Sequence, residues 1–174
     1  MSEKFFDVYI DFGSSKIIAT AFNKKNKKSF SVSNKCFSSF KSTQLNFKDS
    51  KIVLEKLILE IEKKTGEYLN SINLMIDSPE VLSIGVSLSK KNDGKKIRKS
   101  DIQYLIQDAK QQVIKFHPNK NIIHIIASNY KVDNNNFDYP PIDIKCNFFV
   151  IDIIFICYPK ELIKNLESLF YENQ

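Results

Sequence analysis

The sequence predicts a mixed α/β protein made of two small units, each combining strands with a helix. Short runs that alternate apolar and polar residues recur along the chain, and this is the period of a β-strand. Three longer stretches carry apolar residues at the spacing of an amphipathic helix. The composition, 43% hydrophobic with four glycines and five prolines in 174 residues, indicates a globular core and excludes collagen-like or linker sequence.

Residues 1–78 are predicted to form the first unit, with the order β-β-β-α-β. Alternation and turn residues place its elements as strands at 6–10, 17–22 and 29–33, a helix at 52–64 and a strand at 72–76. Asp49 or Ser50 is expected to cap the start of the helix, and Gly66 is expected to end it.

Residues 79–174 are predicted to form the second unit, in which a strand, a helix and two further strands precede a last helix. The corresponding runs lie at 81–88, 100–117, 122–132, 144–158 and 159–170. Ser100 and Gln103 have the spacing of a capping box, and Pro118 cannot continue the first of these helices. Pro159 suits the first turn of the last helix, which we assign to this unit.

The net charge of +6 is concentrated in one short segment. Ser89–Lys99 holds six of the 26 basic residues and one of the 20 acidic residues. A second lysine cluster, Lys24–Lys28, lies between two apolar runs, and both clusters contain polar turn residues. Neither cluster forms a continuous basic face with aromatic stacking residues, so we interpret both as solvated turns and do not expect nucleic-acid binding.

Cysteine use and hydropathy indicate an intracellular chain. Cys36, Cys146 and Cys157 are odd in number and match no metal-binding spacing, so neither a disulfide framework nor a zinc site is expected. The N-terminus lacks the apolar segment of a signal peptide, and no apolar run is long enough to cross a bilayer. We therefore expect a cytoplasmic location without an intrinsic membrane segment.

A candidate phosphate site lies between the first two predicted strands. A tight hairpin with glycine and small hydroxyl residues directs backbone N–H groups toward a phosphate. An aspartate at the strand end can hold water around Mg²⁺, and a lysine can add positive charge. The same residues also suit an ordinary turn, so both interpretations stay open for Asp11, Gly13, Ser14, Ser15 and Lys16.

No nucleophile, base and acid set is visible, so neither catalytic residues nor metal ligands are predicted. His124 lies in an apolar strand and is interpreted as a packed or edge histidine. His117 precedes a proline and is expected to stabilise a helix C-terminus. Asp152 is the one charge in a very apolar strand, and we interpret it as protection of an exposed sheet edge.

Taken together, several segments resemble the FtsA family of bacterial cell-division proteins, which belongs to the actin superfamily. The hairpin is similar to the family's first phosphate motif. The further similarities cover a helix start, two strands and the last helix, and the full set is Val8–Ile17, Arg98–Ile102, Ile122–Ile126, Tyr130–Asp133 and Asn165-Leu166. This resemblance implies a partial actin-like (ribonuclease H-like) subdomain 1A at 1–78 and an SHS2 module, subdomain 1C, at 79–174.

The chain also departs from the family pattern. It reads Ile76-Asp77-Ser78 where the family has Ile-Ser-Gly, and Ala127 where the family has proline. The second phosphate hairpin and the adenosine motif that the family places after subdomain 1C are not found in the 174 residues. ATP and Mg²⁺, which the family implies, are therefore expected to bind weakly or not at all, and no enzymatic activity is expected.

The resemblance implies an interaction protein that helps assemble the division ring at the cytoplasmic face of the membrane, through contacts of subdomain 1C with itself and with other divisome proteins. FtsZ would be bound only through regions not found in these residues. The long apolar run Asn147–Cys157 is of the type that a neighbour's strand completes, and the expected contact residues are Asn147, Phe149, Ile151 and Ile154.

A central, buried position for this run is the equal alternative. Two other functions also stay open from the sequence. One is an ATPase or sugar-kinase relative that needs a second lobe, and the other is a pilus-assembly relative of FtsA.

Overall fold

A computed structural model describes residues 5–13, 16–35 and 47–171. They belong to two compact units, and each unit has its own sheet and hydrophobic core. The first unit comprises Met1–Pro79 together with Asn165–Gln174, and the second comprises Glu80–Lys164. The boundary after Pro79 lies within one residue of the predicted one.

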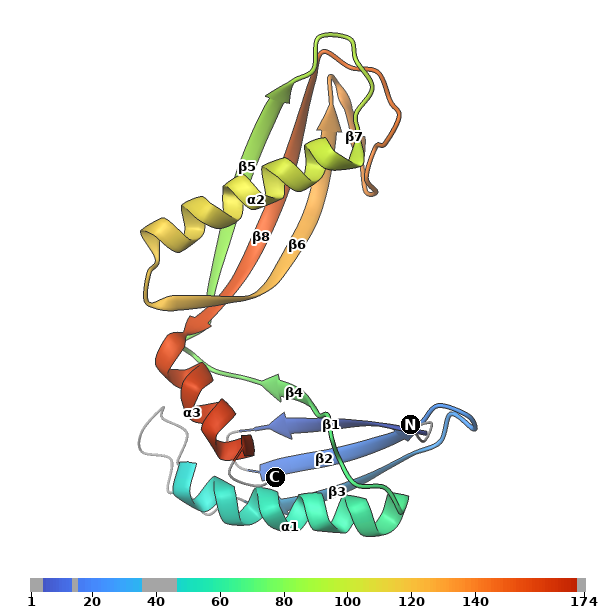
Figure 1. Ribbon diagram of the computed structural model, residues 1–174, viewed down its shortest axis with the longest axis vertical. Coiled ribbons are helices and arrows are strands. Elements are labelled where there is room, and N and C mark those ends of the chain that lie inside the picture. The colour runs from blue at the N-terminus through green and yellow to red at the C-terminus, as the bar shows by residue number, and fades with distance from the viewer. Residues whose placement is uncertain (1–4, 14–15, 36–46, 172–174) are drawn as a thin grey trace. The chain divides into compact units, whose positions relative to one another are not determined.

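The first unit is a four-stranded sheet covered on one face by a helix (Figure 1). In chain order its elements are β1 (Phe6–Phe12), β2 (Lys16–Asn23), β3 (Ser29–Lys35), α1 (Phe47–Thr65) and β4 (Asn73–Ile76). The strands lie side by side in the order β3-β2-β1-β4. β1 runs antiparallel to β2. β1 runs parallel to β4, because α1 lies between β3 and β4 in the chain and β4 therefore begins at the same end of the sheet as β1. This element order is the predicted one.

The bounds of α1 differ from the expectation at its start and agree at its end. The helix begins at Phe47, so Asp49 and Ser50 lie inside its first turn and neither is the predicted N-cap. It ends at Thr65, and Gly66 takes the left-handed conformation (φ 69°) that favours glycine after a helix. The Gly66 N–H donates to the Glu62 carbonyl oxygen at 2.8 Å, which closes the last turn.

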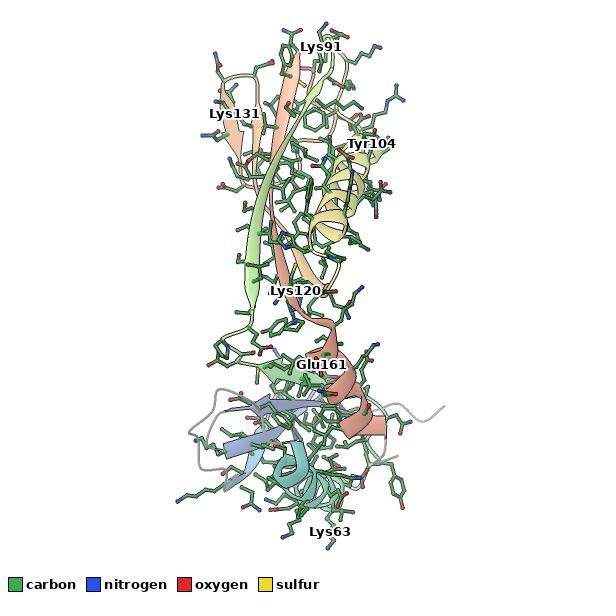
Figure 2. The ribbon with its side chains drawn as sticks, turned by 90° about the vertical axis from the view of Figure 1, so that its left-hand side faces the viewer. Lys63, Lys91, Tyr104, Lys120, Lys131 and Glu161 are labelled. Atoms are coloured by element: carbon green, nitrogen blue, oxygen red, sulfur yellow. The ribbon has the colours of Figure 1, made fainter. Side chains whose placement is uncertain are left out.

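The second unit is an antiparallel sheet with the strand order β5-β8-β6-β7 and with α2 on one face (Figures 1 and 2). Its elements are β5 (Leu82–Lys91), α2 (Lys99–Phe116), β6 (Lys120–Val132), β7 (Asn135–Phe137) and β8 (Phe148–Pro159). The predicted strand-helix-strand-strand order is confirmed. β7 is an addition, formed where a turn was expected, because Asp133 adopts a left-handed conformation (φ 50°) that folds the asparagine run back onto β6.

The position of β8 overturns the expected edge strand. Its main-chain groups pair with β5 on one side and with β6 on the other, so it is the central strand of the sheet. One side of β8 is fully buried in the core beneath α2 and includes Phe149, Ile151 and Phe155. A long β-branched and aromatic run suits a strand between two neighbours, and this is the alternative that the structure selects.

The start of α2 is also displaced from the expectation. Arg98 is the N-cap residue, and Ser100 lies inside the helix. The Asp101 carboxylate accepts a hydrogen bond from the Arg98 backbone N–H at 2.9 Å, so Asp101, two residues earlier in the chain, has the capping-box role that was expected of Gln103. His117 is the C-cap residue, at the helix end where it was predicted.

The last helix, α3 (Lys160–Tyr171), was assigned to the second unit, and this is wrong for its C-terminal part. Asn165–Gln174 groups with the first unit. The reason is its apolar stripe, because Leu169 is buried in the first core and Phe170 packs against that core. Across the described parts of the chain, no helix is both long and apolar enough to span a membrane.

Candidate functional site

β1 and β2 form an antiparallel hairpin. Phe12 pairs with Ile17 and Asp11 with Ile18, and Gly13 directly follows β1. A Cβ at Gly13 would lie 3.0 Å from the Lys16 carbonyl oxygen, and this close approach favours glycine. Ser14 and Ser15 lie outside the described residues.

Asp11 and Lys16 meet the predicted geometry only in part. Both lie at the hairpin end of the first sheet, with Asp11 half-buried on the face opposite the core and Lys16 exposed. The register partners of Asp11 are Ile18 on β2 and Met75 on β4. No group of three histidine, cysteine or acidic side chains that could hold a metal ion occurs among the residues that the structure describes.

The second sheet presents the more extensive candidate site. α2 covers one of its faces, and we call the opposite face the open face, because no other described element of this unit lies over it (Figure 2). The register sets its side chains in rows across three strands. Three successive rows are Ser83, Ile156 and His124; Gly85, Ile154 and Ile126; and Ser87, Asp152 and Asn129.

The open face is apolar at its centre, and its β5 side carries small residues. Ile154 is half-buried, and Ile126 is 47% exposed on the neighbouring strand. On β5 the residues toward this face are small, and a Cβ at Gly85 would meet nothing within 4 Å. The apolar surface around Ile154 is therefore accessible from the β5 side.

Asp152 lies within this apolar surface and is held by neutral groups. Its Oδ1 accepts a hydrogen bond from the Ser87 hydroxyl at 2.5 Å, and its Oδ2 accepts one from the Asn129 amide at 3.2 Å. The ion pairs found between described side chains do not include Asp152. Each donor comes from a strand next to β8, so the carboxylate is fixed in orientation but not neutralised by a cation. The expectation that it protects a sheet edge is wrong, because β8 is central.

The four expected contact residues divide between core and surface. Phe149 and Ile151 are fully buried, so no partner can touch them without unfolding the unit. The Asn147 backbone is occupied, because its carbonyl accepts from the Asn92 N–H and its own N–H donates to the Asp133 carboxylate. Ile154 is the one that reaches the open face.

Sequence reasoning missed Ser87 and Asn129 as partners of Asp152. One signal was present, since small residues recur with period two at Ser83, Gly85, Ser87 and Ser89. Such a run indicates a strand face that no large side chain occupies.

The described cysteines are structural. Cys146 and Cys157 are free thiols buried in the second core, in agreement with their interpretation as small hydrophobic residues. Burial raises the pKa of both thiols, so neither is a ready nucleophile at neutral pH. Cys36 lies outside the described residues. His124 is exposed on the open face.

The comparison with protein families identifies the second unit. Residues 80–157 match the family model described as the SHS2 domain inserted in FTSA. The matched range starts at the first residue of the second unit and ends within β8. A search of curated proteins found no match for the chain.

Proposed function

The chain is an FtsA-like protein that contains an SHS2 domain, and from this premise we propose that it acts in bacterial cell division as an interaction protein. In this proposal the second unit contacts other copies and other divisome proteins during assembly of the division ring at the cytoplasmic face of the membrane. The first unit is the partial actin-like subdomain 1A. Its β-β-β-α-β order, with a glycine hairpin between the first two strands, supports that assignment.

The observation that carries the proposal is the open face of the SHS2 sheet. A sheet needs cover on its apolar surface, and uncovered patches of several hundred Å² on soluble proteins usually mark binding sites. Here Ile126 and Ile154 lie side by side on the open face, with Asp152 in the adjacent row. A partner that covers this surface would bury the isoleucines and meet a fixed carboxylate.

A charge placed on the open face tests this function. In cells that produce a fluorescent fusion of the chain, we expect the wild type to form a band at the division site and Ile154→Lys to be diffuse. Lysine at this position opposes burial of the surface while leaving the core beneath α2 intact. Gln107→Lys, which adds the same charge on the exposed side of α2, serves as the matched control.

Circular dichroism and localisation together decide the outcome of this experiment. Both variants should keep the wild-type far-ultraviolet circular dichroism, so that loss of localisation reflects a lost contact. A wild-type chain that is diffuse at all stages of the cell cycle, or an Ile154→Lys variant that localises normally, would refute the proposal.

For the nucleotide we propose weak binding without turnover. In this proposal the β1-β2 hairpin and Lys16 supply one side of a phosphate cradle, and the sequence shows no second hairpin of this type. We expect the 174-residue chain to bind ATP·Mg²⁺ with a dissociation constant above about 1 mM, which corresponds to less than about 4 kcal/mol of binding free energy. Isothermal titration calorimetry measures this, and micromolar affinity that Lys16→Gln abolishes would contradict it.

A further inference from the structure

One end of the second unit is formed by the β5-α2 turn and the segment before β8. The two segments are joined by backbone hydrogen bonds. The Asn92 N–H donates to the Asn147 carbonyl at 2.7 Å, and the Gly94 N–H donates to the Cys146 carbonyl at 2.9 Å. These bonds join residues 91–99 to residues 139–148, and we call this region the basic end. Figure 2 shows Lys91 at this end of the unit.

Most of the chain's net positive charge lies in the basic end, which accounts for four of the six net charges. Residues 91–99 hold five cations and Asp93, and in residues 139–148 Lys145 and Asp143 cancel. Lys91 is paired with Asp93 at 2.9 Å, and Lys96 approaches Asp143 at 3.9 Å. The remaining exposed cations form no ion pair with any side chain in the described ranges, and they are Lys95, Arg98, Lys99 and Lys145. Lys145 lies directly across a β-bridge from Lys96.

Exposed apolar side chains lie among these charges. Phe148 is 52% exposed and is the register partner of Lys91, and Ile142 is 44% exposed in the neighbouring segment. Phe148 is held in place because its backbone N–H donates to the Asp133 carboxylate at 2.9 Å. Tyr139 is 63% exposed and packs edge-to-face on Phe137. The combination of unpaired cations with aromatic and aliphatic groups is therefore built into the fold.

We propose that the basic end docks onto the surface of an anionic lipid bilayer. Lysine and arginine side chains would lie at the headgroup phosphates, while Phe148 and Ile142 would enter the boundary between headgroups and acyl chains. Nucleic acid is the other polyanion that would attract these cations. The lipid surface is favoured because aliphatic Ile142 gains nothing from base stacking, whereas it gains from transfer into an apolar layer. Phe148 lies on the same side of β8 as Ile154 but six residues along the strand, and the two sites are tested by different substitutions.

Partition into vesicles measures the electrostatic part of the proposal. We expect the full chain to co-sediment with vesicles of equimolar phosphatidylglycerol and phosphatidylcholine, and not with phosphatidylcholine alone. Raising NaCl from about 0.1 M to about 1 M, where the Debye length falls from about 10 Å to about 3 Å, should release it. Each neutralised cation near the surface weakens binding by about fivefold, so Lys95→Gln/Lys99→Gln should bind more than about tenfold more weakly.

A matched variant distinguishes this site from the overall positive charge of the chain. Lys56 and Lys63 are exposed on α1 in the first unit, and Lys56→Gln/Lys63→Gln removes the same net charge. We expect this control to bind vesicles within about twofold of the wild type, on the scale set by the fivefold effect of one cation at the surface. Equal weakening of both double variants would overturn the proposal, as would equal partition into the two types of vesicle.

A tryptophan reporter tests the insertion of apolar groups. The chain has no tryptophan, so Phe148→Trp introduces a single tryptophan at the basic end, which can be excited selectively over the tyrosines. On addition of phosphatidylglycerol vesicles its emission should shift to shorter wavelength and its quenching by iodide should fall. Tyr68→Trp places the fluorophore at an 83% exposed position of the first unit and should show neither change.

Duplex DNA serves as the competing polyanion in the same assays. Binding of DNA that Lys95→Gln/Lys99→Gln weakens, together with an unshifted Phe148→Trp emission in vesicles, would replace the lipid surface by nucleic acid. Failure of the chain to bind vesicles at about 0.1 M NaCl would also overturn the proposal. Neither result would bear on the open face, which Ile154→Lys tests independently.

Discussion

At the scale of single residues, one carboxylate organises the start of α2. Asp101 accepts a hydrogen bond from the Arg98 backbone N–H and pairs with the Lys90 ammonium group at the end of β5. The hydrogen bond from Lys90, followed by that from the Arg98 backbone, holds the pKa of the Asp101 carboxyl below its usual value. The side chains are only 18% and 33% exposed for Asp101 and Lys90, so solvent screens the pair less than a surface ion pair.

We predict that Asp101→Asn lowers the free energy of unfolding by about 1 kcal/mol at neutral pH, because the charged form makes the stronger bonds. A lowered folded-state pKa stabilises the fold above the unfolded value of about 3.9, and this stabilisation is lost as the pH falls through the folded-state pKa. Urea denaturation at several pH values measures it. The difference between wild type and variant should vanish in acid.

Asp108→Asn in the same helix is the control. In the part of the chain that the structure describes, the Asp108 side chain accepts one hydrogen bond, from the Gln112 amide. It should change stability by less than about 0.5 kcal/mol, as surface substitutions usually do. A gap between Asp101→Asn and wild type that stays constant down to acid pH would show that the charge of Asp101 contributes nothing.

At the scale of elements, β8 determines how the second unit is built. It lies between β5 and β6, and its alternate residues face either the core beneath α2 or the open face. Ile153 is buried in that core, whereas Ile154 is half-buried on the opposite side. Two adjacent isoleucines of one strand therefore have different energetic roles.

This difference predicts unequal costs for the same chemical change. Ile153→Ala should destabilise the second unit by about 2–5 kcal/mol, because it leaves a cavity in a packed core. Ile154→Ala should cost about 1 kcal/mol or less, since water already reaches the side chain. Thermal or urea denaturation of the two variants side by side checks the prediction, and equal losses would show that the open face is covered in solution.

At the scale of the whole molecule, the chain has two hydrophobic cores. One contains Leu57 of α1 and Leu169 of α3, and the other contains Ile153 of β8 and Ala109 of α2. No described residue belongs to both cores. Separate cores make local unfolding of one unit less costly than unfolding of the entire chain.

We therefore predict that hydrogen exchange detects the two units separately. Leu57→Ala should speed exchange in β1 and β2 while the amides of β8 keep their protection, and Ile153→Ala should do the reverse. Mass spectrometry of peptides from each unit measures this. Uniform acceleration over the whole chain by either variant would mean that the units unfold as one.

Several features were determined by the sequence alone. Local alternation and helical spacing predicted the order of strands and helices, and Gly66 marked a helix end correctly. These signals succeed because they depend on neighbours within a few residues. The resemblance to the FtsA family also came from short segments, and the match of residues 80–157 to the SHS2 domain confirms it for that part of the chain.

Tertiary structure alone decided what these elements do together. Asp152 obtains its hydrogen bond from Ser87, 65 residues earlier in the chain, and no local pattern contains that pairing. The central place of β8 and the grouping of Leu169 with the first core likewise depend on contacts between distant segments. An apolar run has the same period at an edge and at the centre of a sheet. A central strand differs from an edge strand in having main-chain hydrogen bonds on both sides. Because β8 has both sets of hydrogen bonds, its backbone is not available to a partner, and the candidate interaction site is the open face.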